Sequence, residues 1–582
     1  MGGLNRKKKY LLLLVLILST VFFVIQITVQ LERESSTTLN IGELKILANL
    51  SALSGEFEGF IFNRMVLVNS KKKSDFYFFE KYITDGIGAF RELPDTRDEV
   101  CKERLFNVPK KSKVSVIIVF RNEARSTLLR TIVSVLQRTP QRFLNEIIVI
   151  DDFSDDETIL TDLVKLPFEG DFIKSHRNRK HNKGLIESRN LRAKLATGGD
   201  YIVFLDSHSE VNVGWIVPLL DRLASYPAMA VSPVLDSIDA TTFQYLASSK
   251  DLKGGFDWNL HFRWIPIGEE EREAKNHPSN PFTNIIFFFG VLISRNWFFK
   301  LNGFNPLLKG WGGESIEMSI KLWLCGGQIE IVPCSRVGHV FQRTNKQHPQ
   351  DLPNEEQHLR NRKVIAESWL DEYKYFFFTL NPSLVGVADV KVNGTLTSST
   401  GHDNNNDIRS RRRIQRIKKD GQCRPFSWFL LTIFQELKLP NSDYIAFGKL
   451  SSGGKCLKTV SAAFGAGGTF PDVVFKKCYH GDASYWFLSK KDGRLVSDMG
   501  TCLSVGTKKS NDSQWPVEVR QMAVVLEECN NAKSWMWKGG KLIYGNTQMC
   551  LDNRLSKTVT MTECRRGVAS QLFRFSVGGK SG

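Results

Sequence analysis

Three polar residues end an apolar run in the segment YIVFLDSHSE, residues 201–210. Side chains at positions i and i+2 of a strand lie on the same face, so Asp206 and His208 can reach one ligand. A carboxylate oxygen together with an imidazole nitrogen suits Mn²⁺ or a similar divalent cation. His339, in SRVGHVFQ after the apolar run IEIVP, is a candidate third ligand. A lone histidine is more often a satisfied polar group, so the metal hypothesis depends on all three residues meeting.

The segments around this motif predict a sheet with helices between its strands. Short β-branched apolar runs, typical of strands buried on both faces, occur in KVSVIIVF, NEIIVIDD and YIVFLD. Helical spacing separates them in ARSTLLRTIVSVLQRT and GLIESRNLRAKLATG. This alternation predicts an α/β fold with a doubly wound sheet of parallel strands. Because ligands bind beyond the carboxyl ends of such strands, we expect Asp152 and Asp206 at a ligand site.

The N-terminus predicts a membrane anchor. Basic residues 6–9 precede an apolar run from Leu11 to Val29, which at ~1.5 Å per residue crosses roughly one hydrocarbon core. The alternative is a cleaved secretory signal, whose apolar part would be ~7–15 residues and would precede a small-residue cleavage site that QLERESS does not offer. The basic cluster keeps the N-terminus cytosolic and places the body in the lumen.

The composition fits a lumenal protein of more than one domain. The chain has 582 residues, which is too long for a single hydrophobic core, so two or more domains are expected. A net charge of +18 alone would allow a nucleic-acid partner, but a lumenal body disfavours one. None of the 10 cysteines forms a CxxC pair, which disfavours zinc, and an even number in an oxidising compartment predicts disulfides. We interpret the basic run within 392–420 as a solvated face.

One pattern repeats three times near the C-terminus. CLKTV, CLSVG and CLDNR begin at Cys456, Cys502 and Cys550, and each is followed by a second cysteine and then by SYWF, SWMW or SQLF. One copy is too small to bury its own apolar face, so we expect three stacked units that share a core. β-rich units of this size predict a trefoil.

Several ordered blocks now point to a family. FRNEARSTLLRTIVSVL, IDDFSDD, FLDSHSEVNVGW, GGFDWNLHFRW, GWGGESIE, LWLCGGQIEIVPCSRVGHVF and CRPFSWFL lie in this order between about residues 96 and 440. With the C-terminal repeats, they make the chain resemble the polypeptide N-acetylgalactosaminyltransferases, Golgi type II membrane enzymes with a GT-A catalytic domain and a ricin-type β-trefoil lectin domain. The expected parts are a cytosolic tail at 1–10, a transmembrane signal anchor at 11–29, a lumenal stem at 30–95, the catalytic domain at 96–440 and the lectin domain at 441–582.

The resemblance implies a role for each matching residue. The candidate Mn²⁺ ligands are Asp206, His208 and His339. The candidate residues for the nucleotide sugar, UDP-GalNAc, are Asp152, Ser207, Trp311, Gly312 and Gly313, and the candidate catalytic residues are Trp311 and Glu314. The acceptor would be a Ser or Thr hydroxyl of a polypeptide or glycopeptide, glycosylated with retention of configuration, which initiates mucin-type O-glycosylation. Mn²⁺ would stabilise negative charge on the departing UDP.

The family pairing of cysteines can also be carried over, and it uses all ten. The implied disulfides are Cys101–Cys334, Cys325–Cys423, Cys456–Cys478, Cys502–Cys529 and Cys550–Cys564.

Some positions depart from the family pattern. Asn182 and Gln342 stand where the family has arginines, Gln347 replaces a tyrosine, and Phe288 and Phe289 replace small residues. Each lost arginine removes a charge-assisted hydrogen bond of about 1.5–3 kcal/mol. The alternative function is therefore a catalytically silent member that acts as a Golgi glycan-binding or regulatory protein. The complete metal triad favours the enzyme.

The three lectin repeats are also uneven. The residue after each CL is Lys458, Ser504 or Asp552, so only the third repeat keeps the aspartate of binding repeats, together with Gln571 of the QxW pattern. If a repeat binds GalNAc, we expect it to be the third. The alternative is that all three are structural, with core aromatics at Trp486, Phe487, Trp535, Trp537 and Phe573.

Overall fold

The computed structural model describes most of the chain from residue 79 onward. The described ranges are 79–156, 158–160, 172–178, 181–275, 277, 279–287, 290–341, 355–385, 405–460, 472–478, 484–506, 523–554 and 559–577. The predicted anchor at 11–29 and most of the predicted stem lie outside them. Within these ranges, no helix has the length and apolar character needed to cross a membrane.

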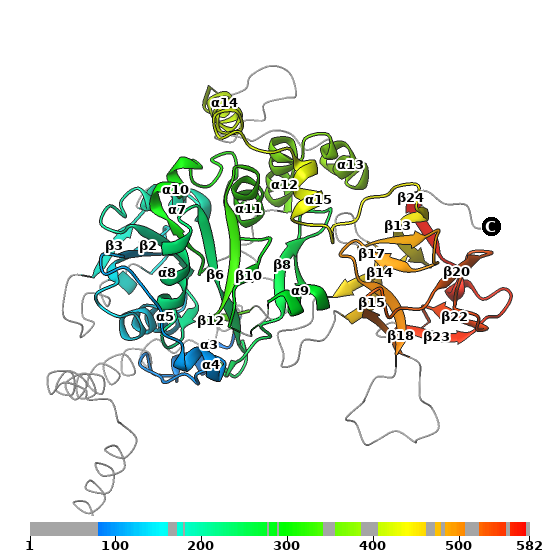
Figure 1. The fold of residues 1–582 in the computed structure, drawn as a ribbon, viewed down its shortest axis with the longest axis horizontal. Helices are drawn as coiled ribbons and strands as arrows, with labels where there is room; N and C mark the ends of the chain where they lie inside the picture. Colours follow the sequence, from blue (N-terminus) through cyan, green and yellow to red (C-terminus); the bar gives the residue numbers. More distant parts are fainter. Residues whose placement is uncertain are drawn as a thin grey trace, which may run out of the picture. The chain divides into compact units, whose positions relative to one another are not determined.

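A mixed β-sheet forms the centre of the N-terminal part (Figure 1). Its main order, within the described residues, is β10-β12-β6-β11-β4-β1-β2-β3, with β5 paired to β12 and β7 to β6. The strands are β1 (Val114–Phe120), β2 (Leu144–Asp151), β3 (Ile173–Arg177), β4 (Tyr201–Asp206), β5 (Ser209–Val211), β6 (Met229–Ile238), β7 (Tyr245–Leu246), β10 (Phe282–Thr283), β11 (Leu292–Ser294) and β12 (Gln328–Val340). A separate hairpin joins β8 (Leu252–Phe256) to β9 (Phe262–Pro266).

The strands predicted from the apolar runs are confirmed, and β1, β2 and β4 pair in parallel. Phe120 lies opposite Asp151 and Val119 lies opposite Asp206, so the carboxyl ends of β2 and β4 meet at one edge of the sheet. The sheet also contains a strand that was not predicted, β11, which runs antiparallel to both β4 and β6. β3 was also not predicted. β11 is too short to show a period, and β3 is a polar, partly exposed edge strand.

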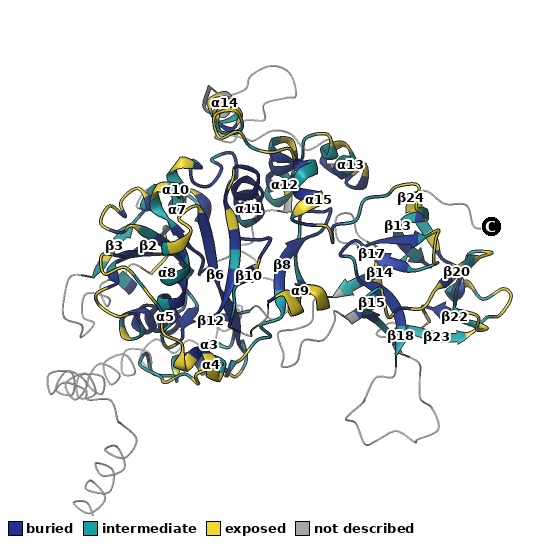
Figure 2. Cartoon of the chain, viewed as in Figure 1, coloured by how far each residue is buried: buried dark blue, intermediate teal, exposed yellow. Residues whose placement is uncertain are grey.

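Helices connect and cover these strands. They are α3 (Lys81–Asp85), α4 (Glu99–Glu103), α5 (Arg125–Arg138), α7 (Leu185–Ala193), α8 (Ile216–Ser225), α9 (Glu269–Ala274), α10 (Arg295–Lys300), α11 (Glu314–Leu324), α12 (Glu355–Trp369), α13 (Tyr373–Leu380), η2 (Pro382–Leu384), α14 (Asn405–Asp420) and α15 (Phe426–Thr432). The predicted helices α5 and α7 are confirmed, and they contact β5 and β1, respectively. β6 is buried along its whole length and β12 along most of its length, whereas α9 faces solvent (Figure 2).

The basic run forms α14. Its Arg412, Arg413 and Arg416 are exposed, as expected of a solvated face, while Ile414 is buried.

The C-terminal part consists of antiparallel strands and one short helix. These are β13 (Tyr444–Ser452), β14 (Lys455–Val460), β15 (Asp472–Lys477), β16 (Tyr485–Ser489), β17 (Leu495–Ser497), β18 (Cys502–Gly506), β19 (Ala523–Glu527), β20 (Trp535–Lys538), β21 (Lys541–Tyr544), β22 (Met549–Asp552), β23 (Thr560–Glu563), η3 (Ala569–Gln571) and β24 (Arg574–Val577). Each repeat sends its leucine after cysteine into one shared core with Trp486, Trp535 and Phe573. The predicted common core is confirmed.

The five predicted disulfides are all present. Cys101–Cys334 and Cys325–Cys423 join distant parts of the N-terminal region, and the other three each close one C-terminal repeat. No cysteine is left free.

Candidate active site

Asp206, His208 and His339 come together at the sheet edge. Asp206 ends β4, His208 lies in the turn between β4 and β5, and His339 lies in β12, which pairs with β5 so that His339 is opposite Ser209. One carboxylate oxygen and two imidazole nitrogens, one atom from each residue, lie within 4.8 Å of one another. This donor set fits Mn²⁺ or a similar divalent cation.

The electrostatics of Asp206 and His339 suit a cation. Burial alone would raise the pKa of Asp206, but His339, Arg189 and His208 outweigh it and hold that pKa well below its ordinary value. Burial lowers the pKa of His339 to about 4, although Asp206 opposes the shift. Burial would also lower the pKa of His208, but the Glu123 carboxylate outweighs it and raises that pKa. Asp206 is therefore ionised and His339 neutral at neutral pH, the forms in which these side chains ligate metals.

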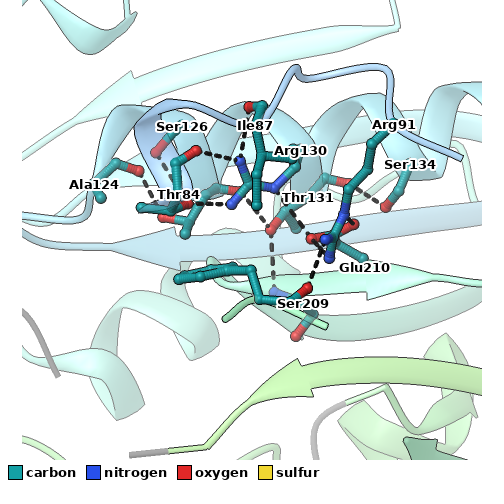
Figure 3. A network of polar contacts seen from close by, with 12 residues as sticks. Thr84, Ile87, Arg91, Ala124, Ser126, Arg130, Thr131, Ser134, Ser209 and Glu210 are labelled. Atoms are coloured by element: carbon teal, nitrogen blue, oxygen red, sulfur yellow. Dashed lines mark hydrogen bonds and ion pairs between the residues drawn. The ribbon is translucent and has the colours of Figure 1, made fainter. Parts of the chain in front are cut away.

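Polar side chains of α5 hold the backbone around residues 207–208, the turn between β4 and β5 that carries His208 and is called the metal turn below. Thr131 Oγ1 donates to Ser207 O at 2.9 Å and accepts from Ser209 N at 3.1 Å. Ser134 Oγ accepts from Val211 N at 3.1 Å. Figure 3 shows Thr131 joined to Ser209, with Ser134 further along α5. The turn that carries His208 is thus fixed by backbone contacts to a buried helix.

The layer extends to the residues that precede the catalytic sheet. The Glu210 carboxylate accepts hydrogen bonds from Arg130 at 3.1 Å and from Arg91 at 2.7 and 2.8 Å. Arg130 also donates to Thr84 O at 2.9 Å and to Ile87 O at 3.2 Å (Figure 3). The last residues of the predicted stem therefore pack on α5, directly behind the metal turn.

Arg189 of α7 joins two candidate site residues. It donates to Asp206 Oδ1 at 2.6 Å and lies 3.5 Å from Glu314 Oε1. Burial raises the pKa of Glu314 even though Arg189 opposes the shift. Glu314 begins α11 and accepts from Gly312 N at 2.8 Å. One buried guanidinium thus ties the metal ligand to the turn at 311–314.

The turn at 311–314 has a left-handed backbone that glycine supplies. Gly312 has φ 101° and Gly313 has φ 87°, and a Cβ on Gly312 would lie 2.5 Å from the His358 ring. Asn361 of α12 donates to Gly312 O at 2.8 Å and to Lys309 O at 2.9 Å. Trp311 is 49% exposed and packs edge-on against His358. The turn therefore presents a half-exposed indole next to Glu314, which Arg189 links to Asp206.

Asp152 lies at the carboxyl end of β2 and is buried. Its carboxylate accepts from Lys183 N at 2.9 Å, from Gly184 N at 2.7 Å and from the side chains of Asn178 and Ser188. Gly184 in turn approaches Gly310, and Ile186 N donates to Gly310 O at 3.2 Å. Asp152 thus organises the loop that contacts the segment before Trp311. Its predicted contact with the nucleotide stays a prediction.

Of the positions that depart from the family pattern, the structure describes only Asn182, which is exposed. Phe288, Phe289, Gln342 and Gln347 lie outside the described residues.

In the third C-terminal repeat, Asp552 and Gln571 are adjacent and buried. Asp552 Oδ2 accepts from Arg554 Nε at 2.9 Å and from Thr562 Oγ1 at 2.7 Å. Gln571 donates to Thr562 Oγ1 and to Glu563 O, both at 2.8 Å. Burial opposes the shift, but Arg554 and Thr562 lower the pKa of Asp552 to about 2. A sugar at this carboxylate would have to displace Arg554, whose side chain is half exposed.

Three site residues were missed at the level of sequence: Glu123, Arg189 and Asn361. Glu123 lies inside the block FRNEARST, where its charge at the start of a helix looks like an ordinary capping residue. Arg189 and Asn361 lie on helices with no local pattern that sets them apart. Only packing reveals what they contact.

Comparisons with known proteins agree with this geometry. Residues 115–294 match the family described as glycosyl transferase family 2, and residues 274–346 match the N-terminal domain of galactosyltransferase. The chain is 39% identical over 526 residues to putative polypeptide N-acetylgalactosaminyltransferase 13 of Drosophila melanogaster, covering 86% of each. It is 34% identical to human polypeptide N-acetylgalactosaminyltransferase 16, covering 85% of this chain and 83% of that one.

A solved structure is similar over nearly the whole chain. The crystal structure of GalNAc-T7 with UDP, GalNAc and Mn²⁺ superposes with a TM-score of 0.54 at 26% identity, covering 88% of this chain and 91% of that one. The fold is thus that of a GT-A glycosyltransferase, followed by a β-rich region that fits a lectin domain. At the sequence level the chain belongs to the polypeptide N-acetylgalactosaminyltransferase family.

Proposed function

We propose that this protein transfers GalNAc from UDP-GalNAc to Ser and Thr hydroxyls of polypeptides, with Mn²⁺ as cofactor and with retention of configuration. The observation that carries the proposal is the meeting of Asp206, His208 and His339 within 4.8 Å at the carboxyl edge of the sheet. Membership of the family supports the substrate class, since its named relatives are polypeptide N-acetylgalactosaminyltransferases.

The residues of this chain have distinct tasks in that reaction. Asp206, His208 and His339 would hold Mn²⁺, which supplies a Lewis acid for the charge on the UDP leaving group. The turn of Gly312 and Gly313 lets the backbone approach the donor closely, and Trp311 offers an apolar face to the sugar. Arg189 and Asn361 keep the metal ligand and this turn in register.

A transfer assay tests the proposal. The full chain is expected to label a Ser/Thr-containing peptide from UDP-GalNAc in the presence of Mn²⁺, and Asp206→Ala is expected to give no product. Product from both proteins, or from neither, would contradict the assignment.

The competing function is a silent family member, and UDP binding separates the two. Calorimetric titration of UDP with and without Mn²⁺ is expected to show binding that requires the metal. Absence of UDP binding under both conditions would favour a glycan-binding or regulatory role.

We further propose a Golgi location with type II topology, through the apolar segment 11–29. In sealed Golgi vesicles, a protease added outside is expected to remove the short N-terminal tail alone. Digestion of the body would refute this topology.

For the C-terminal part we propose a ricin-type trefoil whose third repeat is its candidate GalNAc site. The support is the pairing of Asp552 with Gln571, which the other two repeats lack. Asp552→Ala is expected to abolish retention on a GalNAc column. Unchanged retention, or none for the unaltered chain, would assign the repeat a structural role.

A further inference from the structure

Glu123 lies behind the candidate metal ligands, just before α5. Its Oε2 is 2.8 Å from His208 Nδ1 and accepts a hydrogen bond from Ser207 Oγ at 2.7 Å. Its Oε1 accepts from Ala124 N at 2.9 Å and from Thr127 Oγ1 at 3.3 Å. These four contacts match the lone-pair capacity of one carboxylate, so the group is held in a single orientation.

The contact between Glu123 and His208 decides which ring nitrogen can bind a metal. An ionised carboxylate only accepts hydrogen bonds, so His208 Nδ1 carries the proton that it donates. In the neutral ring, the other nitrogen, Nε2, then keeps its lone pair. A carboxylate paired with a ligating histidine in this way fixes the ring orientation and makes the ligating nitrogen more basic.

The position of Glu123 suits this task. Its side chain is only 10% exposed, and the N-terminus of the 14-residue helix α5 favours a negative charge there. Thr131 and Ser134 hold the backbone of the metal turn independently of Glu123. Removal of the carboxylate should therefore release the imidazole ring while leaving the turn in place.

We infer that Glu123 is a positioning residue for the metal site, which holds His208 as the Nδ1–H tautomer so that Nε2 is the ligand atom. This inference rests on the proposed Mn²⁺ site, and it adds a group that does not itself ligate the metal. Ser207, which resemblance assigns to the nucleotide sugar, takes part in the same arrangement through its hydroxyl.

The test measures Mn²⁺ affinity rather than turnover. MnCl₂ is titrated into the full chain with UDP present, and free Mn²⁺ is followed by electron paramagnetic resonance. Glu123→Ala is expected to weaken Mn²⁺ binding about 10–100-fold, the range seen when such carboxylate partners are removed. Glu123→Gln keeps an amide oxygen that can accept the hydrogen bond from His208 Nδ1–H. Its loss of Mn²⁺ affinity should therefore be smaller than that of Glu123→Ala.

Two controls separate positioning from general damage. Glu103→Ala removes an exposed carboxylate at the end of α4 and is expected to leave Mn²⁺ affinity unchanged. Thermal unfolding reports whether each variant folds. If Glu123→Ala does not fold, the Mn²⁺ affinity of the isosteric Glu123→Gln tests the inference instead. Partial recovery in Glu123→Gln at an unchanged melting temperature is the result that a merely structural role would not give.

The outcomes distinguish this inference from the proposed activity. Mn²⁺ affinities within twofold of the unaltered chain in the folded Glu123 variants would overturn the inference, as would an unaltered chain that binds no Mn²⁺. If the unaltered chain binds Mn²⁺ but transfers no sugar, the proposed activity fails while the Glu123 assignment is still judged by the affinity ratio.

Discussion

Arg189 is a single buried residue that contacts two acidic residues of the candidate site. Asp206 and Glu314 are both largely buried carboxylates, and unpaired charges in such positions are costly. A guanidinium shared between them offsets their repulsion and fixes the distance between the metal ligand and the start of α11. The family pattern singles out the carboxylates, but only packing places the cation that contacts both of them.

Asp552 provides a pH test at the scale of one residue. Its folded pKa of about 2 lies below the ordinary value of ~3.9, so its ionisation stabilises the fold. The contribution, about 2 kcal/mol, is fully present above pH ~4 and is lost as the pH falls through about 2. Asp552→Asn should therefore destabilise the C-terminal part at pH 7 and much less at pH 2.5.

Urea-dependent hydrogen exchange of peptides from β22 and β23 measures this difference. The exposed Asp443→Asn serves as the control and should have no comparable effect. An equal destabilisation by Asp552→Asn at both pH values would contradict the electrostatic account.

At the scale of elements, two positions in the segment 310–313 require glycine for different reasons. Gly310 has φ 67° and open space where a Cβ would lie, whereas Gly312 has φ 101° and the His358 ring in that place. Gly310→Ala should cost only the left-handed backbone preference, about 1–2 kcal/mol. Gly312→Ala adds a clash that must move His358 or the turn.

Equilibrium unfolding and UDP titration compare the two alanine variants. Gly312→Ala is expected to be the less stable and, if the turn approaches the donor as proposed, to bind UDP more weakly. If Gly310→Ala proved as damaging as Gly312→Ala, steric contact with His358 would not be the cause.

Two of the C-terminal repeats share the same hydrogen bond from a tryptophan side chain to the backbone. Trp486 Nε1 donates to Leu457 O at 3.0 Å and Trp535 Nε1 donates to Leu503 O at 2.7 Å, so two repeats tie their aromatic residue to the strand after their first cysteine. In the third repeat, Phe573 fills the core without such a bond. Trp486, Trp535 and Phe573 thus lie in the shared core, whereas Trp537 is only partly buried against it.

Replacement by phenylalanine isolates the hydrogen bond. Trp486→Phe and Trp535→Phe each leave a carbonyl without its donor, and each should destabilise the C-terminal part by about 1–3 kcal/mol, in addition to lost packing. Trp537 is only partly buried and its indole nitrogen has no hydrogen-bond partner within the described residues, so Trp537→Phe is the matched control. Similar unfolding midpoints for all three variants would refute the role of the bond.

At the scale of the whole molecule, disulfides of very different span hold the chain. Cys101–Cys334 closes a separation of 233 residues and Cys550–Cys564 one of 14. Because loop-closure entropy grows with length, removing the first pair by alanine should cost about 5 kcal/mol and removing the second about 3 kcal/mol.

Denaturant unfolding of the two double-alanine variants, monitored separately for the N-terminal and C-terminal parts by hydrogen exchange, checks this order. The short bridge should affect only its own repeat. A larger cost for Cys550–Cys564 than for Cys101–Cys334 would contradict the entropic account.

The sequence by itself determined the local elements and the chemistry of the metal ligands. Short β-branched apolar runs such as 114–120 favour strands buried on both faces. Asp206 and His208 were expected to share a face because the strand period is two. The resemblance also placed His339 and the disulfide pairs correctly. Tertiary structure alone decided that β11 runs antiparallel, since strand direction depends on which neighbours are free to pair.

Tertiary structure also decided which residues support the site residues. Glu123 is 85 positions from His208, Arg189 is 125 from Glu314, and Asn361 is 49 from Gly312, so no local period connects these pairs. Contacts over such separations are set by tertiary packing, in which α5 contacts β5, α7 contacts β1 and α12 contacts α11, because only packing brings donor and acceptor within hydrogen-bond distance.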